Sequence, residues 1–285
     1  LQARGNMMIP MIAQVTGSVV NILLDIMLIF GTGHIPALGI RGAAVATVIG
    51  QWVAMVITLL AVMKKYSLRG KFKLEACKQI YENGIGSIVT QSLYTIYIVG
   101  LNMILKIFTE DAVTVLGIYY KIQSFFFIPL LGFQQVLLPL FSYHYGAGDR
   151  HRNREILKCS MIFSVIIMAV ATGIFFLFPE KLVHIFSKGS AIVAIGKTAF
   201  PVISISFVFA GLTIVITSYL QGIAHIKASL FIIVLRQIVL LVPLAWLLHF
   251  IGLNAVWWTF PVTEIIASVT GILIIWILHK EDSAL

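Results

Sequence analysis

Long apolar runs dominate this sequence and constrain what it can fold into. Eight of them follow one another, with approximate bounds 8–31, 41–63, 83–107, 114–142, 155–178, 192–221, 226–250 and 253–279. A helix of roughly 20 apolar residues crosses about 30 Å of hydrocarbon, so each run is long enough to span a membrane. Only 11% of the 285 residues are charged, which is too little polar surface for a soluble globule. We therefore predict an all-α polytopic membrane protein with eight transmembrane helices.

The positive charges are distributed unevenly between the connections that join these runs. Alternate connections carry thirteen Lys and Arg residues on one side of the membrane and five on the other. Cytoplasmic loops of membrane proteins are enriched in Lys and Arg. We therefore predict a multi-pass protein of the cytoplasmic (inner) membrane, surrounded by the lipid bilayer, with both ends of the chain in the cytoplasm. Because the net charge of +9 resides in these connections, no binding of nucleic acid is expected.

A basic polar segment at residues 64–82 divides the sequence into two unequal parts. Residues 1–63 hold two apolar runs, and residues 83–285 hold six. The segments GNMMIP near the start and GIAHIK at 222–227 each precede a run, a short Gly-containing turn and a second run. This order puts Gln51 and Glu264 at comparable positions. Halves that share one fold are typical of transporters, so the segment 64–82 is predicted to be a cytoplasmic linker between two bundles.

Polar residues inside the first apolar run form a stripe. Gln14, Ser18, Asn21 and Asp25 follow a 4-3-4 spacing, which places them on one face of a helix. An ionisable group at mid-membrane costs about 3 kcal/mol on insertion scales, so such groups should face protein or a water-filled cavity. Two interpretations follow: a cavity wall with Asp25 as a cation site, or a seam of interhelical hydrogen bonds with Asp25 near the interface.

The third and fourth runs also carry polar side chains. Gln91 and Asn102 lie on one face of the third run, and Gln91 is an uncharged candidate for contact with a substrate or an ion. In the fourth run, Gln123 and Gln134 are eleven residues apart, about three helical turns, and therefore share a face. Lys121 is either a counter-ion of a buried carboxylate or a residue that extends its ammonium group to the interface.

Two opposite charges occupy the last two runs at similar depth. Arg236 lies ten residues after Ile226, about 15 Å into its helix, which is too deep for easy extension to water. Glu264 lies eleven residues after Leu253, so we predict that it pairs with Arg236. The pair has either a gating role or a purely structural one. Glu264 shares its helical face with small and aromatic residues that permit close helix approach, namely Trp257, Pro261, Ser268 and Gly271.

Several function classes lack their sequence motifs. GAGDRHR at 146–152 has neither the Lys nor the Ser/Thr of a nucleotide-binding P-loop, and it follows a predicted span rather than a strand. HExxH, CxxC, GxSxG and paired Asp motifs are missing as well. We therefore expect neither enzyme activity nor a cofactor. Cys77 and Cys159 fall in or beside basic segments predicted to be cytoplasmic, so no disulfide is expected.

Several stretches in combination resemble the MATE (multidrug and toxic compound extrusion) family, in particular its multidrug branch typical of Gram-positive bacteria. RGNMMIPMI, NILLDIMLIFG and GIRGAAVATVIGQ resemble the fifth and sixth helices of the family. GIGSIVTQS at 84–92 resembles the seventh, with Gly86 where the family usually has proline. GIYYKIQSFFFIPLLGFQQVLLPLFSYHYGAGD resembles the eighth helix, and LRQIVLLVPLAWLL and GLNAVWWTFPVTE resemble the last two.

The resemblance implies twelve helices in two six-helix lobes around a cavity, and exchange of a cationic drug for Na⁺ or H⁺ by alternating access. Residues 1–63 would be the last two helices of the amino-terminal lobe, residues 83–285 would be the carboxy-terminal lobe, and the chain, which opens with Leu1 instead of methionine, would lack the first four helices. Some relatives have a cation-binding glutamate on the seventh helix, where this sequence has Gln91. A monomer that transports small cationic substrates is expected.

A flippase for lipid-linked oligosaccharides or lipids, from the same superfamily, is the alternative. Such a protein needs a strongly cationic cavity to hold pyrophosphate. From this part of the protein, only Lys121 and Arg236 are predicted to supply that charge to a cavity. The sequence therefore favours the multidrug transporter, with Asp25, Gln91, Lys121, Gln123, Arg236 and Glu264 as the principal candidates for the transport pathway.

Overall fold

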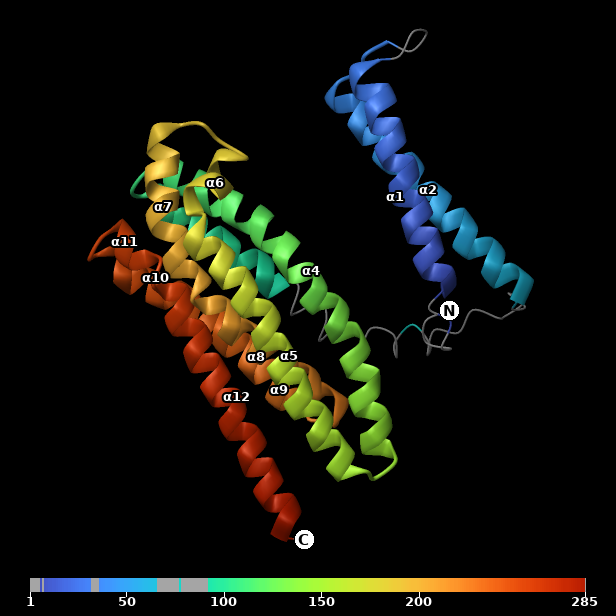
Figure 1. The fold of residues 1–285 in the computed structure, drawn as a ribbon, viewed down its shortest axis with the longest axis vertical. Helices are drawn as coiled ribbons and strands as arrows, with labels where there is room; N and C mark the ends of the chain where they lie inside the picture. The colour runs from blue at the N-terminus through green and yellow to red at the C-terminus, as the bar shows by residue number, and fades with distance from the viewer. Residues whose placement is uncertain (1–5, 7, 32–35, 66–76, 78–91, 285) are drawn as a thin grey trace. The chain divides into compact units, whose positions relative to one another are not determined.

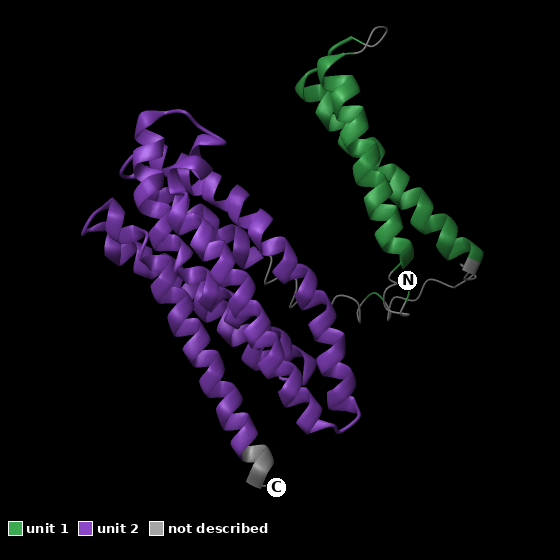
Figure 2. Cartoon of the chain, viewed as in Figure 1, with its two compact units in different colours: residues 1–78 green, residues 79–285 purple. Residues whose placement is uncertain are grey.

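The computed structural model describes residues 6, 8–31, 36–65, 77 and 92–284 (Figure 1). These residues form helices and short connections without a strand, which confirms the all-α prediction. The chain divides into two compact units, Leu1–Lys78 and Gln79–Leu285 (Figure 2). The division falls inside the predicted linker 64–82, most of which lies outside the described residues, as does Gln91. The assignment of the units to two transporter lobes stays a prediction.

Unit 1 is a pair of helices, α1 (Met8–Phe30) and α2 (Ile40–Lys65). The helices approach closely where Gly17 faces Gly50, because a Cβ on either residue would lie 2.7 Å from the carbonyl oxygen of the other. Small residues at such crossings let helix backbones meet in a membrane. The connection turns back on α1 through a hydrogen bond of 2.9 Å from the N–H of Leu38 to the carbonyl of Leu28.

The first helix that the structure describes in unit 2, Ser92–Lys106, meets α10 (Leu241–His249) where Gly100 faces Val242. Helix α8 lies at the centre of the unit and packs against α4, α5 and α12. Ten further elements follow the first helix, and they are α4 (Glu110–Gly146), α5 (Arg150–Leu177), α6 (Pro179–His184), α7 (Ser190–Ser204), α8 (Ser206–Gly222), α9 (Ile226–Val234), the π-helical segment η2 (Leu235–Leu240), α10 (Leu241–His249), α11 (Leu253–Val256) and α12 (Thr259–Ala284).

Six described helices are long and apolar enough to cross a membrane, or seven if α7 and α8, which meet at a bend of 42°, form one span. The remaining predicted run, 83–107, is described only from Ser92, and its helix Ser92–Lys106 is shorter. Each of the eight apolar runs thus contains a helix. The number of eight transmembrane helices stays a prediction.

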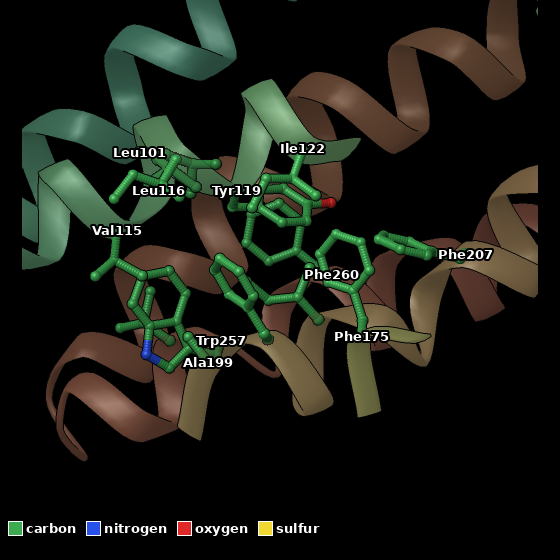
Figure 3. Packing of buried hydrophobic residues seen from close by; sticks show 14 of the residues in the cluster. Leu101, Val115, Leu116, Tyr119, Ile122, Phe175, Ala199, Phe207, Trp257 and Phe260 are labelled. Atoms are coloured by element: carbon green, nitrogen blue, oxygen red, sulfur yellow. The ribbon is translucent and has the colours of Figure 1, made fainter. Parts of the chain in front are cut away.

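Aromatic rings hold four helices of unit 2 together (Figure 3). The ring of Tyr119 from α4 lies 5.6 Å from that of Phe260 on α12 and 6.3 Å from that of Phe207 on α8, measured between centroids. Phe175 of α5 packs 4.9 Å from Phe207. Aromatic pairs at these distances each add about 0.5–1.5 kcal/mol beyond the area they bury. Helices α4, α5, α8 and α12 are therefore fixed around one ring cluster.

The contact between α12 and α8 should tolerate no added methyl group at Gly271. A Cβ there would lie 2.7 Å from Cγ2 of the buried, β-branched Ile216, so Gly271→Ala should lower the free energy of unfolding by about 1–3 kcal/mol. Gly117→Ala is the control, because a Cβ at Gly117 meets nothing within 4 Å. Thermal unfolding of the purified chain in detergent measures both. Equal midpoints of thermal unfolding for the two variants would contradict the close packing of α12 against α8 at Gly271.

Candidate functional site

A buried ion pair joins α12 to the π-helical segment of unit 2. Nε of Arg236 lies 2.7 Å from Oε1 of Glu264, and the two side chains are 26% and 11% exposed. The predicted pairing is confirmed. A charge of this kind is stable in an apolar interior only with its partner, because removal of one partner leaves the other as an uncompensated buried charge.

The backbone around Arg236 departs from the α-helix. In segment η2 the N–H of Leu241 donates to the carbonyl of Arg236, five residues earlier. Pro243 follows, and it has no N–H to donate to the carbonyl of Val239, four residues before it. One-turn π segments occur frequently at functional sites. Segment η2 was not predicted from the sequence, although Pro243 is the signal that a regular hydrogen-bond ladder is interrupted here.

The face of α12 that carries Glu264 packs into the interior as predicted. Ser268 is 1% exposed, and Pro261 and Gly271 are also buried. Trp257, which lies in the turn just before α12, is 0% exposed. Pro261 lies in the first turn of α12, where a proline costs no helical hydrogen bond. Small residues on this face bring α12 close to α8, and Glu264 is thereby held at a fixed position inside the bundle.

A small polar chamber adjoins the ion pair. Its volume is about 30 Å³, which is enough for about one or two water molecules. Oε2 of Glu264 and Oε1 of Gln237 are buried and accept no hydrogen bond from the part of the chain that the structure describes. These acceptor oxygens suit a hydrogen-bond donor or a small cation. The wall also includes Tyr97, Tyr119, Tyr120, Gln123, Ser206, Ala210, Leu241 and Phe260.

The candidate site residues of the third and fourth predicted runs do not all lie at the chamber. Gln123 lines the chamber, whereas Asn102 and Gln134 are half-buried and outside its lining. Lys121 is exposed, and its Nζ lies 5.8 Å from the ring centroid of Phe186. This position agrees with the interpretation of Lys121 as a residue that extends to the surface. Gln91 lies outside the described residues.

The tyrosines and Gln237 of the chamber were not among the predicted site residues. Their signals were present, because GIYYKIQSFFF combines aromatic and polar residues and Gln237 follows Arg236 directly. Tyr119 faces both the aromatic cluster and the chamber, so a periodicity of apolar positions does not distinguish the two roles.

Unit 1 has a polar groove of its own, with a volume of about 280 Å³. Gln14, Ser18 and Asn21 line it from α1, and Thr47 and Gln51 line it from α2. Nδ2 of Asn21 donates a hydrogen bond of 3.3 Å to Oγ1 of Thr47. The predicted stripe therefore serves as a groove wall and also makes an interhelical hydrogen bond.

Asp25, the fourth residue of the stripe, does not line this groove. Its Oδ1 is buried and accepts no hydrogen bond within the described ranges. Gln51 lies on the groove side of α2. Its correspondence to Glu264 stays a prediction.

The family model named MatE matches residues 86–247, more than half of the chain. The chain belongs to the MatE family. This membership identifies a family of membrane transporters and not of enzymes, as the sequence predicted. The resemblance to this transporter family and the all-α membrane fold predicted from sequence are thus confirmed.

Named relatives of this MatE chain are multidrug transporters. It is 25% identical over 283 residues to the "Multidrug export protein MepA" of Staphylococcus saprophyticus, covering 97% of the chain and 62% of that relative. It is 26% identical over 227 residues to the "Probable multidrug resistance protein NorM" of Thermotoga maritima, covering 78% and 49%. The solved structure of the MATE multidrug transporter DinF-BH superposes with a TM-score of 0.77 at 27% identity, covering 92% of the chain and 60% of that structure. The chain therefore spans less than two thirds of the length of these relatives.

Removal of one partner of the buried ion pair should destabilise unit 2. Arg236→Gln leaves the Glu264 carboxylate buried and unpaired, so we expect a loss of about 3–5 kcal/mol in the free energy of unfolding. The double variant R236Q/E264Q should lose less than the sum of the single variants. Equilibrium unfolding in mixed micelles, followed by tryptophan fluorescence, measures this cycle, because four of the five Trp residues lie in unit 2.

Glu180→Gln provides the matched control for this cycle. Glu180 forms an ion pair with Lys197 at 2.5 Å, and both side chains are largely exposed. The hydrogen bond from Lys197 lowers the pKa of Glu180, but water screens an exposed pair, so its loss should change stability little. If R236Q and E264Q changed the free energy of unfolding additively, the pair would not be coupled. If E180Q lowered that free energy as much as R236Q does, burial would not determine the cost of losing a partner.

Proposed function

We propose that the whole protein is a secondary active multidrug efflux antiporter, which exports cationic organic compounds in exchange for Na⁺ or H⁺. Support comes from the MatE family membership and from the names of two relatives, which refer to multidrug export for MepA and to probable multidrug resistance for NorM. The observation that carries the proposal is the buried Glu264 carboxylate, paired with Arg236 beside a chamber of unoccupied acceptor oxygens.

Charge balance gives this pair a role in coupling. One guanidinium neutralises one carboxylate, so a second cation beside the intact pair would add an uncompensated charge to a region of low dielectric constant. A proton, a Na⁺ ion or a cationic substrate that reaches Glu264 must therefore compete with Arg236. In this proposal, Arg236 pairs with Glu264 between transport cycles. It dissociates from Glu264 when the transported cation binds there.

The walls of the chamber fit an organic cation better than an anion. Tyr97, Tyr119 and Tyr120 present aromatic rings, and a cation over such a ring gains roughly 0.5–2 kcal/mol. Gln123 and Gln237 add amide groups that can orient a polar substituent. The present volume of about 30 Å³ admits no drug-sized molecule, so substrate binding requires the helices to separate.

Two deviations from regular helix provide sites for such a movement. Helices α7 and α8 meet at a bend of 42° just after Pro201, and segment η2 interrupts the regular hydrogen bonds beside Arg236. Bent and irregular membrane helices let bundles rearrange around a central site. We infer that two lobes alternately open the cavity to either side of the cytoplasmic membrane, in a monomer with both ends of this chain in the cytoplasm.

The flippase alternative has less support. Such a protein needs excess positive charge to bind pyrophosphate, but Glu264 neutralises Arg236. Lys121, the other candidate cation, is exposed next to Phe186 and does not line the chamber. Within the described residues, the chamber therefore has no net positive charge from these groups.

Efflux of ethidium from cells that express the whole protein tests the proposal. Efflux should require a Na⁺ gradient or a proton gradient, which an uncoupler collapses. E264Q should lower the gradient-driven rate roughly 5- to 150-fold, the range of a coupling free energy of about 1–3 kcal/mol. E180Q, the same chemical change at an exposed pair, should retain the wild-type rate. Gradient-independent efflux, or equal rates for wild type and E264Q, would overturn the proposed coupling.

A further inference from the structure

A groove lies between α4 and α5. The turn that joins these two helices lies at the same end of unit 2 as the carboxy-terminal end of α12 (Figure 1). The volume of the groove is about 810 Å³, within the range of about 300–1,000 Å³ that is usual for ligand sites. Phe133 and Phe163 line it farther from the α4–α5 turn, with ring centroids 4.8 Å apart. Arg152 and Lys158 line it nearer the α4–α5 turn. The groove thus has an apolar part and a positively charged rim.

The length of α5 places this rim at the membrane surface. The 19 residues from Cys159 to Leu177 contain no Asp, Glu, Lys, Arg or His. At about 1.5 Å per residue they span about 28 Å, close to the hydrocarbon thickness of about 30 Å. Lys158, directly before them, therefore lies at the level of lipid headgroups, and the aromatic end of the groove lies at the level of acyl chains.

Among the described residues, the charges of Arg152 and Lys158 at the rim are only partly balanced. Oε2 of Glu155 accepts a hydrogen bond of 3.3 Å from Nη1 of Arg152, and its Oε1 lies 3.9 Å from Nδ1 of His151. Oδ1 of Asp149, the N-cap residue of α5, accepts a hydrogen bond from the backbone N–H of Arg152. Lys158 is exposed and forms no ion pair with any residue that the structure describes. An anionic group is the ligand that would complete this rim.

The apolar part is open rather than filled by neighbouring helices of unit 2. Val136 is 61% exposed and Phe163 is 47% exposed, and both lie along the groove with Leu140. A surface of this kind at the depth of the acyl chains suits a hydrocarbon chain. A soluble small anion would leave it uncovered.

We propose that this groove is a binding site for an anionic phospholipid. The headgroup phosphate contacts Lys158 and Arg152, and an acyl chain lies along Val136, Leu140 and Phe163. Basic pockets between membrane helices at the surface of an anionic leaflet recognise lipids by this combination of charge and hydrocarbon. A cationic drug is a poorer occupant, because the rim would repel it.

Protection of Cys159 measures occupancy, because this thiol is exposed and lines the groove. Cys77, the other cysteine, is replaced by Ser. The full chain in neutral detergent is titrated with phosphatidylglycerol, and the rate of Cys159 alkylation by a soluble maleimide is recorded relative to the lipid-free rate of the same variant. We expect saturable protection by phosphatidylglycerol and much weaker protection by phosphatidylcholine.

Three substitutions are expected to change phosphatidylglycerol binding in different ways. Lys158→Gln should weaken phosphatidylglycerol binding roughly fivefold, the effect of one cation near an anionic surface. Glu155→Gln should tighten it, because Arg152 loses its competing carboxylate, and misfolding cannot produce a gain of this kind. Lys227→Gln, an exposed lysine at the start of α9, is the matched control and should change nothing.

Each other outcome would overturn the lipid site. Equal protection by phosphatidylcholine would show a purely apolar groove, and protection by inorganic phosphate alone would show a small-anion site. Protection by ethidium would indicate a substrate site, and protection that rises with protein concentration would indicate a contact between two copies. Native mass spectrometry of the unlabelled protein provides a second measurement, in which K158Q should retain less phosphatidylglycerol than wild type or K227Q.

Discussion

Pairing of polar groups inside hydrocarbon is the constraint on which this structure depends. No water is available there to hydrogen-bond a charge or a backbone group, so such a group is costly unless it has a partner within the protein or lines a polar cavity. The Arg236–Glu264 pair is the strongest case, since it joins segment η2 to α12 inside the bundle. The same constraint explains why polar side chains gather along α1 and α2, where Asn21 binds Thr47.

The parts of the fold that depend on composition and spacing could be predicted from the sequence. Runs of apolar residues predicted the helices, because the thickness of the bilayer fixes their length. The depth of Arg236 predicted Glu264 as its partner, because a deep charge has few alternatives to a carboxylate at equal depth. The buried face of α12 from Pro261 to Gly271 followed from helical periodicity.

Other parts of the site depend on three-dimensional packing that one sequence does not specify. Lys121 and Gln123 are two residues apart, yet a helix turns their side chains about 200° relative to each other, so that one reaches the surface and the other the chamber. Tyr97 joins the chamber from a different helix, and only tertiary structure brings it beside Gln237. The bend between α7 and α8 was likewise hidden inside one continuous apolar run.

Segment η2 sets the register of the helix that contains it. A π turn accommodates one residue more than a regular α turn, which rotates everything beyond it by about 100° and displaces it by about 1.5 Å relative to an uninterrupted helix. Arg236 in η2 faces Glu264, whereas Val242, beyond it, faces Gly100 of the helix Ser92–Lys106. If the π turn moved along the helix by a few residues, either Arg236 or Val242 would face a different neighbour, and the helix would stay folded. The position of segment η2 can therefore set how far the face that carries Val242 is rotated relative to the face that carries Arg236 in the same helix.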